Sequence, residues 1–109
     1  MNNPALIKTL RIYLSSSDKY NEQNLDEYLI SKARKSNLHG ATVLKGIMSY
    51  GGSSVVHSYS FTRLTETVPT VIEIIDEQEK VDAFYAQISA ILSNLSYGCM
   101  VYTKNTEIL

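Results

Sequence analysis

His39 and His57 are the only histidines in the sequence, and they are the first residues to test for acid–base or metal chemistry. His39 falls in a predicted turn between a helix and a strand, where a surface or capping role is the ordinary explanation. His57 falls in a long connection, where it could bind a ligand or titrate near neutral pH. No acidic or cysteine cluster at ligand spacing accompanies either histidine, so the sequence predicts no metal site within one chain. A metal shared between subunits stays open.

Nucleophilic chemistry has equally weak support. The chain lacks the G-x-S-x-G pattern of a nucleophile elbow, although a Ser–His–Asp triad assembled in space stays open. The GGSS run at 51–54 could hold an anion with its backbone amides, but it lacks the lysine and the helix of a P-loop. A hinge at the start of a loop explains the run better. Cys99 is interpreted as a small buried hydrophobe. We therefore expect no catalytic residues and no enzymatic activity.

Length and composition describe one domain spanning residues 1–109. Hydrophobic residues make up 44% of the chain, enough for a core without disulfides or metal. The net charge of -1 and the scattered basic residues argue against nucleic-acid binding. The single cysteine excludes an internal disulfide and fits a reducing compartment. The N-terminus lacks the features of a signal peptide, and no apolar run approaches the ~20 residues of a membrane span, so we expect a cytoplasmic protein.

Hydrophobic periodicity predicts four strands, over 6–14, 41–50, 69–76 and 99–104, and two helices, over 22–36 and 77–95. We expect Asn21 to cap the first helix and Asp76, with Glu79, to cap the second. Gly46 within the second strand indicates a bulge or a close backbone approach. The order of elements predicts an α+β fold, a ferredoxin-like βαββαβ split sandwich. Right-handed crossovers place both helices on one face of a four-stranded antiparallel sheet.

The face of this sheet that carries no helix is the most informative part of the prediction. Alternation directs one set of residues toward the helices: Ile12, Leu44, Ile72, Ile74 and Val101. The opposite set comprises Ile7, Thr9, Arg11, Tyr13, Val43, Lys45, Ile47, Val71, Glu73, Ile75, Met100, Tyr102 and Lys104. A monomer rarely leaves so much apolar surface exposed, so we favour association of subunits with the charges paired across or within them. A strand register that is off by one, or a merely amphiphilic face, is the alternative.

The connection over 51–68 is long for so small a domain, and loops of this length are often functional. Within it, four alternating residues predict an extended arm: Val55, His57, Tyr59 and Phe61. Apolar residues in an exposed loop fit docking on a neighbour or a target. These four residues are therefore the candidates for partner contact.

Three runs resemble a known bacterial family: GATVLKGIMSYG at 40–51, VVHSYSFTRLTETVP at 55–69 and VIEIIDEQEKVDAF at 71–84. They are similar to domain of unknown function one-ninety (DUF190), a family of the PII-like superfamily of trimeric regulators. The resemblance spans nearly the whole chain. It implies a ferredoxin-like subunit and a homotrimer whose three sheets enclose the centre. It also implies that the 51–68 loop contacts a partner. Some relatives resemble products encoded beside ion-channel genes, so the resemblance suggests a membrane transporter or channel as that partner.

The resemblance also implies a ligand. In PII proteins proper, adenine nucleotides bind between subunits, at the base of this loop, at a glycine-rich loop and at basic side chains of the last strands. The corresponding ligand-binding candidates here are Lys45, Gly46, Gly51, Gly52, Arg63 and Lys104. The turn before the last strand carries one glycine and no basic residue. The ligand could therefore be an adenine nucleotide or another small anion or metabolite.

The leading hypothesis is a trimeric PII-like regulator that binds a small ligand between subunits and contacts a partner through the 51–68 loop. One alternative is a structural interaction domain that docks a partner without any small ligand. Another is a small enzyme on the same fold. Ligand-dependent order in the loop would separate the first two, and a closed pocket with a placed acid or base would support the third.

Overall fold

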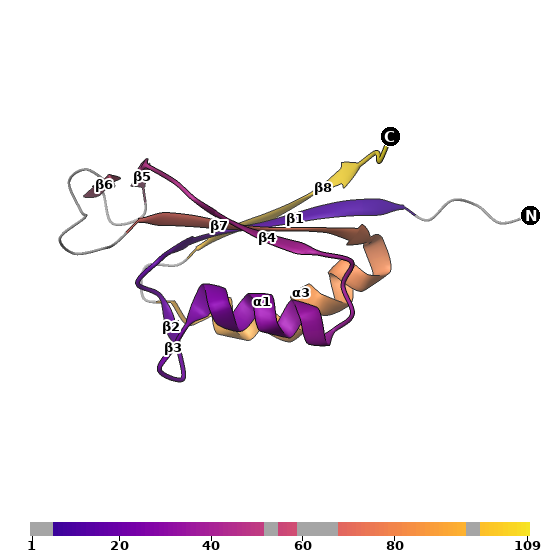
Figure 1. Ribbon diagram of the computed structural model, residues 1–109, viewed down its shortest axis with the longest axis horizontal. Coiled ribbons are helices and arrows are strands. Elements are labelled where there is room, and N and C mark those ends of the chain that lie inside the picture. Colours follow the sequence, from indigo (N-terminus) through magenta and orange to yellow (C-terminus); the bar gives the residue numbers. More distant parts are fainter. Residues whose placement is uncertain (1–5, 52–54, 59–67, 96–98) are drawn as a thin grey trace, which may run out of the picture.

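The computed structural model describes residues 6–51, 55–58, 68–95 and 99–109, and it shows a twisted sheet with two helices on one face (Figure 1). The elements are β1 (Ile7–Ser15), β2 (Lys19–Tyr20), β3 (Gln23–Asn24), α1 (Leu25–Lys35), β4 (Ala41–Lys45), β5 (Met48–Gly51), β6 (Val55–Ser58), β7 (Pro69–Glu77), α3 (Gln78–Ser93) and β8 (Met100–Thr106). The main sheet has the antiparallel order β4-β7-β1-β8. This is the expected ferredoxin-like α+β fold, with β4 and β8 at the two edges.

The hydrophobic core lies between the sheet and the helices. Alternate residues of β1 and β7 point into it, and each helix contributes one apolar stripe at three- and four-residue spacing. The buried core residues are Leu10, Ile12, Leu14, Leu25, Leu29, Ala33, Ile72, Ile74, Val81, Phe84, Ile88 and Leu92. On β1 and β7 the predicted inward and outward residues are confirmed.

Helix α1 begins later than its sequence predicts. Asn21 does not cap it, because Asn21 and Glu22 have positive φ values of 50° and 66° and lie between β2 and β3. Two consecutive positive φ values are typical of a tight hairpin turn, where asparagine is favoured. The N-cap is Asn24. The helix ends at Asn37, whose φ is 58°, and the amides of Asn37 and Leu38 donate to the last carbonyls of α1.

Asp76 also has a different role from the predicted one. It stays in β7, the N-cap of α3 is Glu77, and no side chain caps that helix end. The Asp76 carboxylate accepts the backbone N–H of His39 at 2.6 Å and the backbone N–H of Glu77 at 2.7 Å. Asp76 therefore fastens the turn between α1 and β4 to the end of β7, and the expected capping box with Glu79 does not form.

The predicted strand over 41–50 is divided at Gly46. The Gly46 N–H donates to the carbonyl of Pro69 at 2.7 Å, and a Cβ on Gly46 would lie 2.8 Å from Pro69 Cγ. The close backbone approach predicted for this glycine is confirmed. Beyond it, β5 pairs with β6 as a separate two-stranded ribbon, which we call the β5–β6 arm. Figure 1 shows this arm at the end of the sheet opposite the two chain termini.

Candidate functional site

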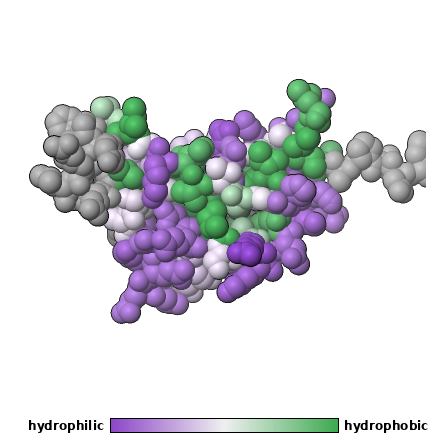
Figure 2. All heavy atoms as spheres, in the orientation of Figure 1, coloured by the Kyte–Doolittle hydropathy of each residue, from purple (hydrophilic) through white to green (hydrophobic). Residues whose placement is uncertain are grey.

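The two sides of the molecule differ in character. Figure 2 shows hydrophilic side chains over α1 and the β2–β3 hairpin, and hydrophobic side chains gathered along the sheet. Among the side chains on or beside the sheet, Leu44 is 50% exposed and Met100 is 58% exposed. The helix-free sheet face, formed by the outward residues of β4, β7, β1 and β8, is therefore the first candidate for function.

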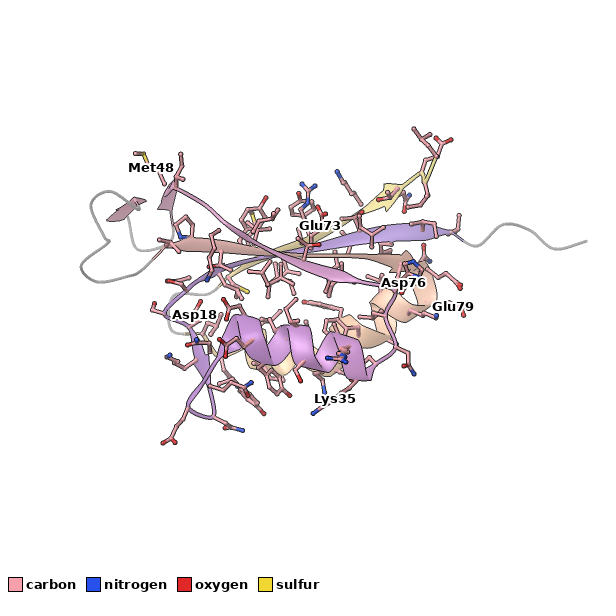
Figure 3. All side chains as sticks on the ribbon, viewed as in Figure 1. Asp18, Lys35, Met48, Glu73, Asp76 and Glu79 are labelled. Atoms are coloured by element: carbon pink, nitrogen blue, oxygen red, sulfur yellow. The ribbon has the colours of Figure 1, made fainter. Side chains whose placement is uncertain are left out.

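A charged network lies at the centre of the helix-free sheet face. Arg11 on β1 is the direct cross-strand neighbour of Glu73 on β7 and of Tyr102 on β8. Its Nε donates to Glu73 Oε2 at 2.8 Å, and its Nη1 donates to the Tyr102 hydroxyl oxygen at 2.9 Å. The Tyr13 and Tyr102 rings stack with centroids 6.1 Å apart. Figure 3 shows Glu73 on the side of the sheet away from the helices.

The hydrogen bonds of this network change its titration. The bonds to Tyr102 and Glu73 raise the pKa of Arg11. The bonds from Arg11 and Tyr13 lower the pKa of Tyr102, and the bond to Tyr102, together with desolvation, raises the pKa of Tyr13. Arg11 therefore stays charged and matched to Glu73. A matched pair amid apolar side chains can be covered by another protein surface at lower cost than a lone charge.

The predicted register of β4 is wrong by one residue. Val43 packs against the core, Leu44 faces away from the helices, and Lys45 reaches Asp26 of α1 with its Nζ 3.0 Å from Oδ2. The sequence could not decide this, because Val43 and Leu44 are both apolar and either can face a core. The pairing of β4 with β7, which ends where Gly46 meets Pro69, fixes the register.

The structure brings some of the predicted ligand-binding residues together and separates others. Lys45 and Gly46 lie at the base of the β5–β6 arm, and Gly51 ends β5. Lys104 lies on β8, at the other edge of the sheet and on the helix-free side with Tyr102. Gly52 and Arg63 lie outside the described residues.

Two of the four predicted partner-contact residues lie in the described part of the arm. Val55 and His57 belong to β6, where they pair with Gly51 and Ser49 of β5. The alternation that predicted an extended segment is thus confirmed for 55–58. Tyr59 and Phe61 lie outside the described residues.

Both ends of the segment that carries the arm are fastened to the sheet. At one end Gly46 bonds to Pro69. At the other end the Val68 N–H donates to the Ser16 hydroxyl oxygen at 2.9 Å, and the Ser16 N–H donates to the Val68 carbonyl at 2.9 Å. The residue after β4 and the connection after β1 are therefore bonded to two consecutive residues, Pro69 and Val68, at the base of the arm.

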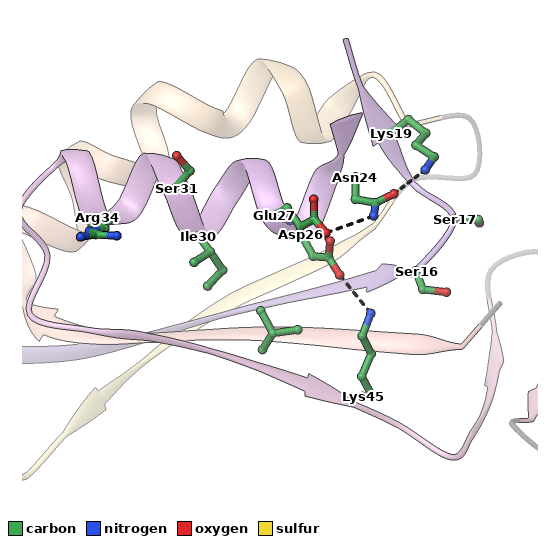
Figure 4. A pocket seen from close by; sticks show the side chains of 11 residues that line it. Ser16, Ser17, Lys19, Asn24, Asp26, Glu27, Ile30, Ser31, Arg34 and Lys45 are labelled. Atoms are coloured by element: carbon green, nitrogen blue, oxygen red, sulfur yellow. Dashed lines mark hydrogen bonds and ion pairs between the residues drawn. The ribbon is translucent and has the colours of Figure 1, made fainter. Parts of the chain in front are cut away.

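Beside this base lies a groove that sequence reasoning missed. It is an open hollow of about 960 Å³ between α1, the connection after β1 and the edge strand β4 (Figure 4). Lys45 and Asp26 form an ion pair in it, and Lys19 bonds to the side chain of Asn24. The β2–β3 hairpin, whose Lys19 and Asn24 line the groove, was expected to be a loop and the start of a helix. A turn-forming asparagine at position 21 was the available signal.

Ranges 6–51, 55–58, 68–95 and 99–109 contain no group of three or more His, Cys, Asp or Glu side chains that could hold a metal ion. Within the same ranges, no helix is long and apolar enough to cross a membrane.

Cys99 is partly buried against the core. Desolvation of its thiol, followed by the charge of Asp18, raises the pKa of that thiol.

Comparison with known proteins shows where the chain belongs. Residues 7–108 match the DUF190 family, described as Uncharacterized ACR. A UPF0166 protein of Aquifex aeolicus is 35% identical over 81 residues, which cover 74% of this chain and 77% of the relative. A UPF0166 protein of Methanocaldococcus jannaschii is 28% identical over 103 residues, covering 91% and 94%.

A solved structure shares the fold. CPII from Thiomonas intermedia K12, bound to ADP and bicarbonate, is similar with a TM-score of 0.68 at 16% identity, covering 94% of this chain and 88% of that chain. At this low sequence identity, the structural similarity shows a shared fold and nothing about function. Together with the family match, it shows that the chain has a PII-like fold and belongs to the DUF190 family.

Proposed function

We propose that this protein is a PII-like trimeric regulator that binds a small ligand between subunits and contacts a partner through the 51–68 loop. The observation that carries the proposal is the helix-free sheet face, where a matched Arg11–Glu73 pair lies among half-exposed apolar and aromatic side chains. We place the protein in the cytoplasm and assign it a regulatory role, not a catalytic one.

The composition of this face supports burial against copies of the same chain. The Arg11 and Glu73 side chains are only 31% and 22% exposed in the isolated subunit, and their charges are already paired. Covering them therefore leaves no unmatched charge, while the apolar side chains around them gain from leaving water. Three sheets facing one axis would cover all three faces at once, because a heterologous contact can close into a ring.

The positions of two lysines support a ligand between subunits. Lys45 and Lys104 lie on the two opposite edge strands of one sheet and point to opposite sides of it. A site that uses both needs two subunits. Gly51 and Gly52 would add backbone amides from the loop and Arg63 a guanidinium, while Gly46, whose N–H is taken by the Pro69 carbonyl, would hold Lys45 in position. CPII is described as bound to ADP and bicarbonate, so we propose an adenine nucleotide or another small anion as the ligand here.

The β5–β6 arm is the proposed contact with a partner, through Val55, His57, Tyr59 and Phe61. An extended ribbon can offer backbone donors and acceptors as well as alternating side chains to another protein. The proposed partner is a membrane transporter or channel, a class that rests on the resemblance described above.

The first experiment measures the mass and the ligand response together. Multi-angle light scattering at micromolar concentration is expected to give three times the subunit mass of 12.2 kDa. A thermal-shift titration of the same sample with ADP, ATP and bicarbonate is expected to raise the melting temperature for at least one of them. A monomer mass would contradict the trimer. A trimer that responds to none of the three would instead be a ligand-independent interaction domain.

The second experiment tests the arm. Replacing residues 53–65 with a short glycine linker is expected to leave folding and trimer mass intact, because loop length contributes little to the free energy of folding. The same change is expected to abolish co-purification with the physiological partner. Dissociation of the shortened protein into monomers would show that the segment is a structural part of the assembly.

A further inference from the structure

The edge strand β4 carries a row of backbone groups that no other strand uses. Within the described residues β4 pairs with β7 alone, so its other side ends the sheet. The 5 residues of β4 span about 17 Å, and the N–H and C=O groups of alternate residues point away from β7. Charged side chains commonly protect such an edge. Thr42, Val43 and Leu44 carry no charge, and Lys45 is held by Asp26, so this edge is open to an added strand.

The groove lies directly beside this edge and has α1 as its second wall (Figure 4). Helix and strand run in opposite directions, so that Lys45 meets Asp26 at one end and Arg34 lies at the other. Along the groove, the lining includes Ile30 of α1 and Val43 of β4, which both pack against the core. A strand laid along β4 would therefore direct every second side chain onto apolar groups of α1 and β4.

The other side of β4 suits the same added strand. Leu44 faces away from the helices and is 50% exposed. In a sheet, a residue directly across from it on an added strand would cover part of this side chain. Neighbouring residues of that strand would then meet Val43 on the helix side and Leu44 on the helix-free side. The strand that fits best therefore has two adjacent apolar residues.

The charges of the groove are balanced at one end only. Both carboxylates of the lining lie in the first turn of α1, close to the two lysines, whereas Arg34 lies in the last turn. In the part of the chain that the structure describes, the exposed Arg34 side chain forms no ion pair. Its guanidinium carries five donors in a planar fork that matches a carboxylate. The Arg34 end of the groove therefore favours an acidic side chain.

The spacing of helix and strand fixes where that acidic side chain must be. From Asp26 to Arg34 the helix rises about 12 Å, and from Lys45 back to Ala41 the strand covers about 14 Å. Since Lys45 and Asp26 are in contact, Arg34 lies level with Ala41. Ala41 and Val43 share the helix side of β4. An acidic residue opposite Ala41 would thus point to the same side as the apolar residue opposite Val43.

We propose that this groove binds an extended peptide segment of another protein, which pairs with β4 in the antiparallel direction as a fifth strand. The segment has two adjacent apolar residues opposite Leu44 and Val43, and an aspartate or glutamate two positions later that bonds to Arg34. Main-chain bonds to a sheet edge supply affinity in this mode of recognition, and the alternating side chains supply specificity. The inference goes beyond the proposed function, because it adds a second surface for a protein partner, separate from the β5–β6 arm and from the ligand between subunits.

The test is fluorescence anisotropy of the full-length protein with a short labelled peptide, capped at both ends. Its centre reads leucine, valine, threonine, glutamate, and serine and threonine flank it. Saturable binding is expected, and Arg34→Gln is expected to weaken it about threefold to fivefold, the range of an exposed charge pair. Replacing the peptide glutamate with glutamine should cause the same loss, and Arg34→Gln should then cause no further loss. Lys35→Gln, an exposed cation of the same helix turn outside the groove lining, is the matched control and is expected to bind normally.

Methylation of the peptide backbone tests the strand pairing itself. Only alternate peptide amides can donate to β4. N-methylation of one alternating set is therefore expected to weaken binding at least tenfold, and methylation of the other set is expected to change it by less than about threefold. Equal losses from the two sets would overturn pairing with β4, and equal affinity of Arg34→Gln and wild type would overturn the predicted direction and register.

Amide NMR of the labelled protein distinguishes the possible occupants of the edge. Peptide-induced shifts are expected in β4 and along α1, and shifts confined to β8 would reject the groove. If the peptide does not bind and the β4 amides already exchange slowly without it, a second copy of the chain covers this edge and the inference is wrong. Absence of binding with fast exchange would reject it as well. The variant with a glycine linker in place of 53–65 is expected to bind the peptide normally, so failure of the proposed function of the arm would leave this result unchanged.

Discussion

One sheet with two unlike faces dominates this molecule. On the helix-covered face, Ile12, Ile72 and Ile74 are fully buried by the helices. On the helix-free face, Arg11 and Glu73 are the direct neighbours of these residues along the strands, and they form an ion pair among half-exposed apolar groups. A shift of one position along a strand thus separates a residue that holds the subunit together from one available to hold subunits to each other.

The difference between the two faces predicts two kinds of substitution effect, one on the stability of the subunit and one on its association. Changes on the covered face are expected to lower the free energy of unfolding of the subunit. Changes on the helix-free face are expected to leave the subunit folded and to weaken its association. The four predictions that follow test this division, from the largest expected effect to the smallest.

Phe84→Ala should have the largest effect. Phe84 is 1% exposed in the centre of the core, and truncating a buried phenylalanine costs about 3–5 kcal/mol through lost burial and the cavity that remains. Urea denaturation followed by circular dichroism measures the loss. Tyr85→Ala, at the next position on α3 but 40% exposed, is the matched control and is expected to cost less than about 1 kcal/mol. Equal losses would show that the helix-covered face is wrongly assigned.

Arg11→Ala should act on assembly. It leaves the Glu73 carboxylate without its partner, which costs about 3–5 kcal/mol if the face is buried between subunits and about 1 kcal/mol or less if it stays in water. The expected result is a lower mass by light scattering with an unchanged subunit circular dichroism spectrum. The double variant Arg11→Leu with Glu73→Leu removes both charges and is expected to restore association. A trimer that tolerates Arg11→Ala would place the interface elsewhere.

Asp76→Asn should remove a pH-dependent part of subunit stability. Burial of Asp76 would raise its pKa, but the N–H donors of His39 and Glu77, with the charges of Lys80 and His39, outweigh it and hold the pKa below its ordinary value of 3.8. The stabilisation is therefore complete above the unfolded pKa and is lost as the pH falls through the lower folded pKa. At pH 7 we expect Asp76→Asn to cost about 1.5–3 kcal/mol.

The pH series provides the check for Asp76. The difference in unfolding free energy between wild type and Asp76→Asn is expected to shrink as the pH is lowered below 3.8. Asp82→Asn, which breaks an ion pair with Lys8 in which Asp82 is 54% exposed, is the control and is expected to change stability by less than about 1 kcal/mol. A constant difference across the acid range would mean that Asp76 acts through packing and not through its charge.

Gly46→Ala should have the smallest effect of the four. The new Cβ would meet the rigid Pro69 ring at 2.8 Å, so we expect a loss of about 1–3 kcal/mol together with altered amide shifts in β5. Gly40→Ala is the matched control, because nothing lies within 4 Å of a Cβ there. That control is expected to be neutral or to stabilise by about 0.4–1 kcal/mol. If both variants behave alike, the contact between Gly46 and Pro69 does not fix the register of β4.

Most of the fold could be predicted from the sequence, because strict alternation in β1 and β7 and the broad stripe of α3 each permit one orientation. Gly46 also signalled a close approach correctly. The register of β4 could not be predicted, since it depends on which of two adjacent apolar residues faces α1, and a contact with Pro69 far along the chain decides it. The resemblance to DUF190 was confirmed by the match over 7–108.

The candidate site was harder to predict than the fold. The Arg11–Glu73 network follows from strand alternation once the strands are paired, so the sequence came close to it. The groove joins residues from the connection after β1, the β2–β3 hairpin, α1 and β4. The turn at Asn21 and Glu22 and the observed register of β4, which differs by one residue from the predicted one, bring these residues together. No spacing pattern in the sequence predicts that they lie side by side.

The fastening of Gly46 to Pro69 has a consequence for engineering. The chain leaves the sheet after Gly46 and returns to it at Pro69, and the Gly46 N–H donates to the Pro69 carbonyl at 2.7 Å. The sheet itself therefore holds the two ends of the intervening segment together. Closing a different stretch of chain between these points then adds only the slow logarithmic cost of its length. We therefore expect that residues 47–67 can be replaced by a foreign recognition peptide or a reporter while the rest of the subunit keeps its structure.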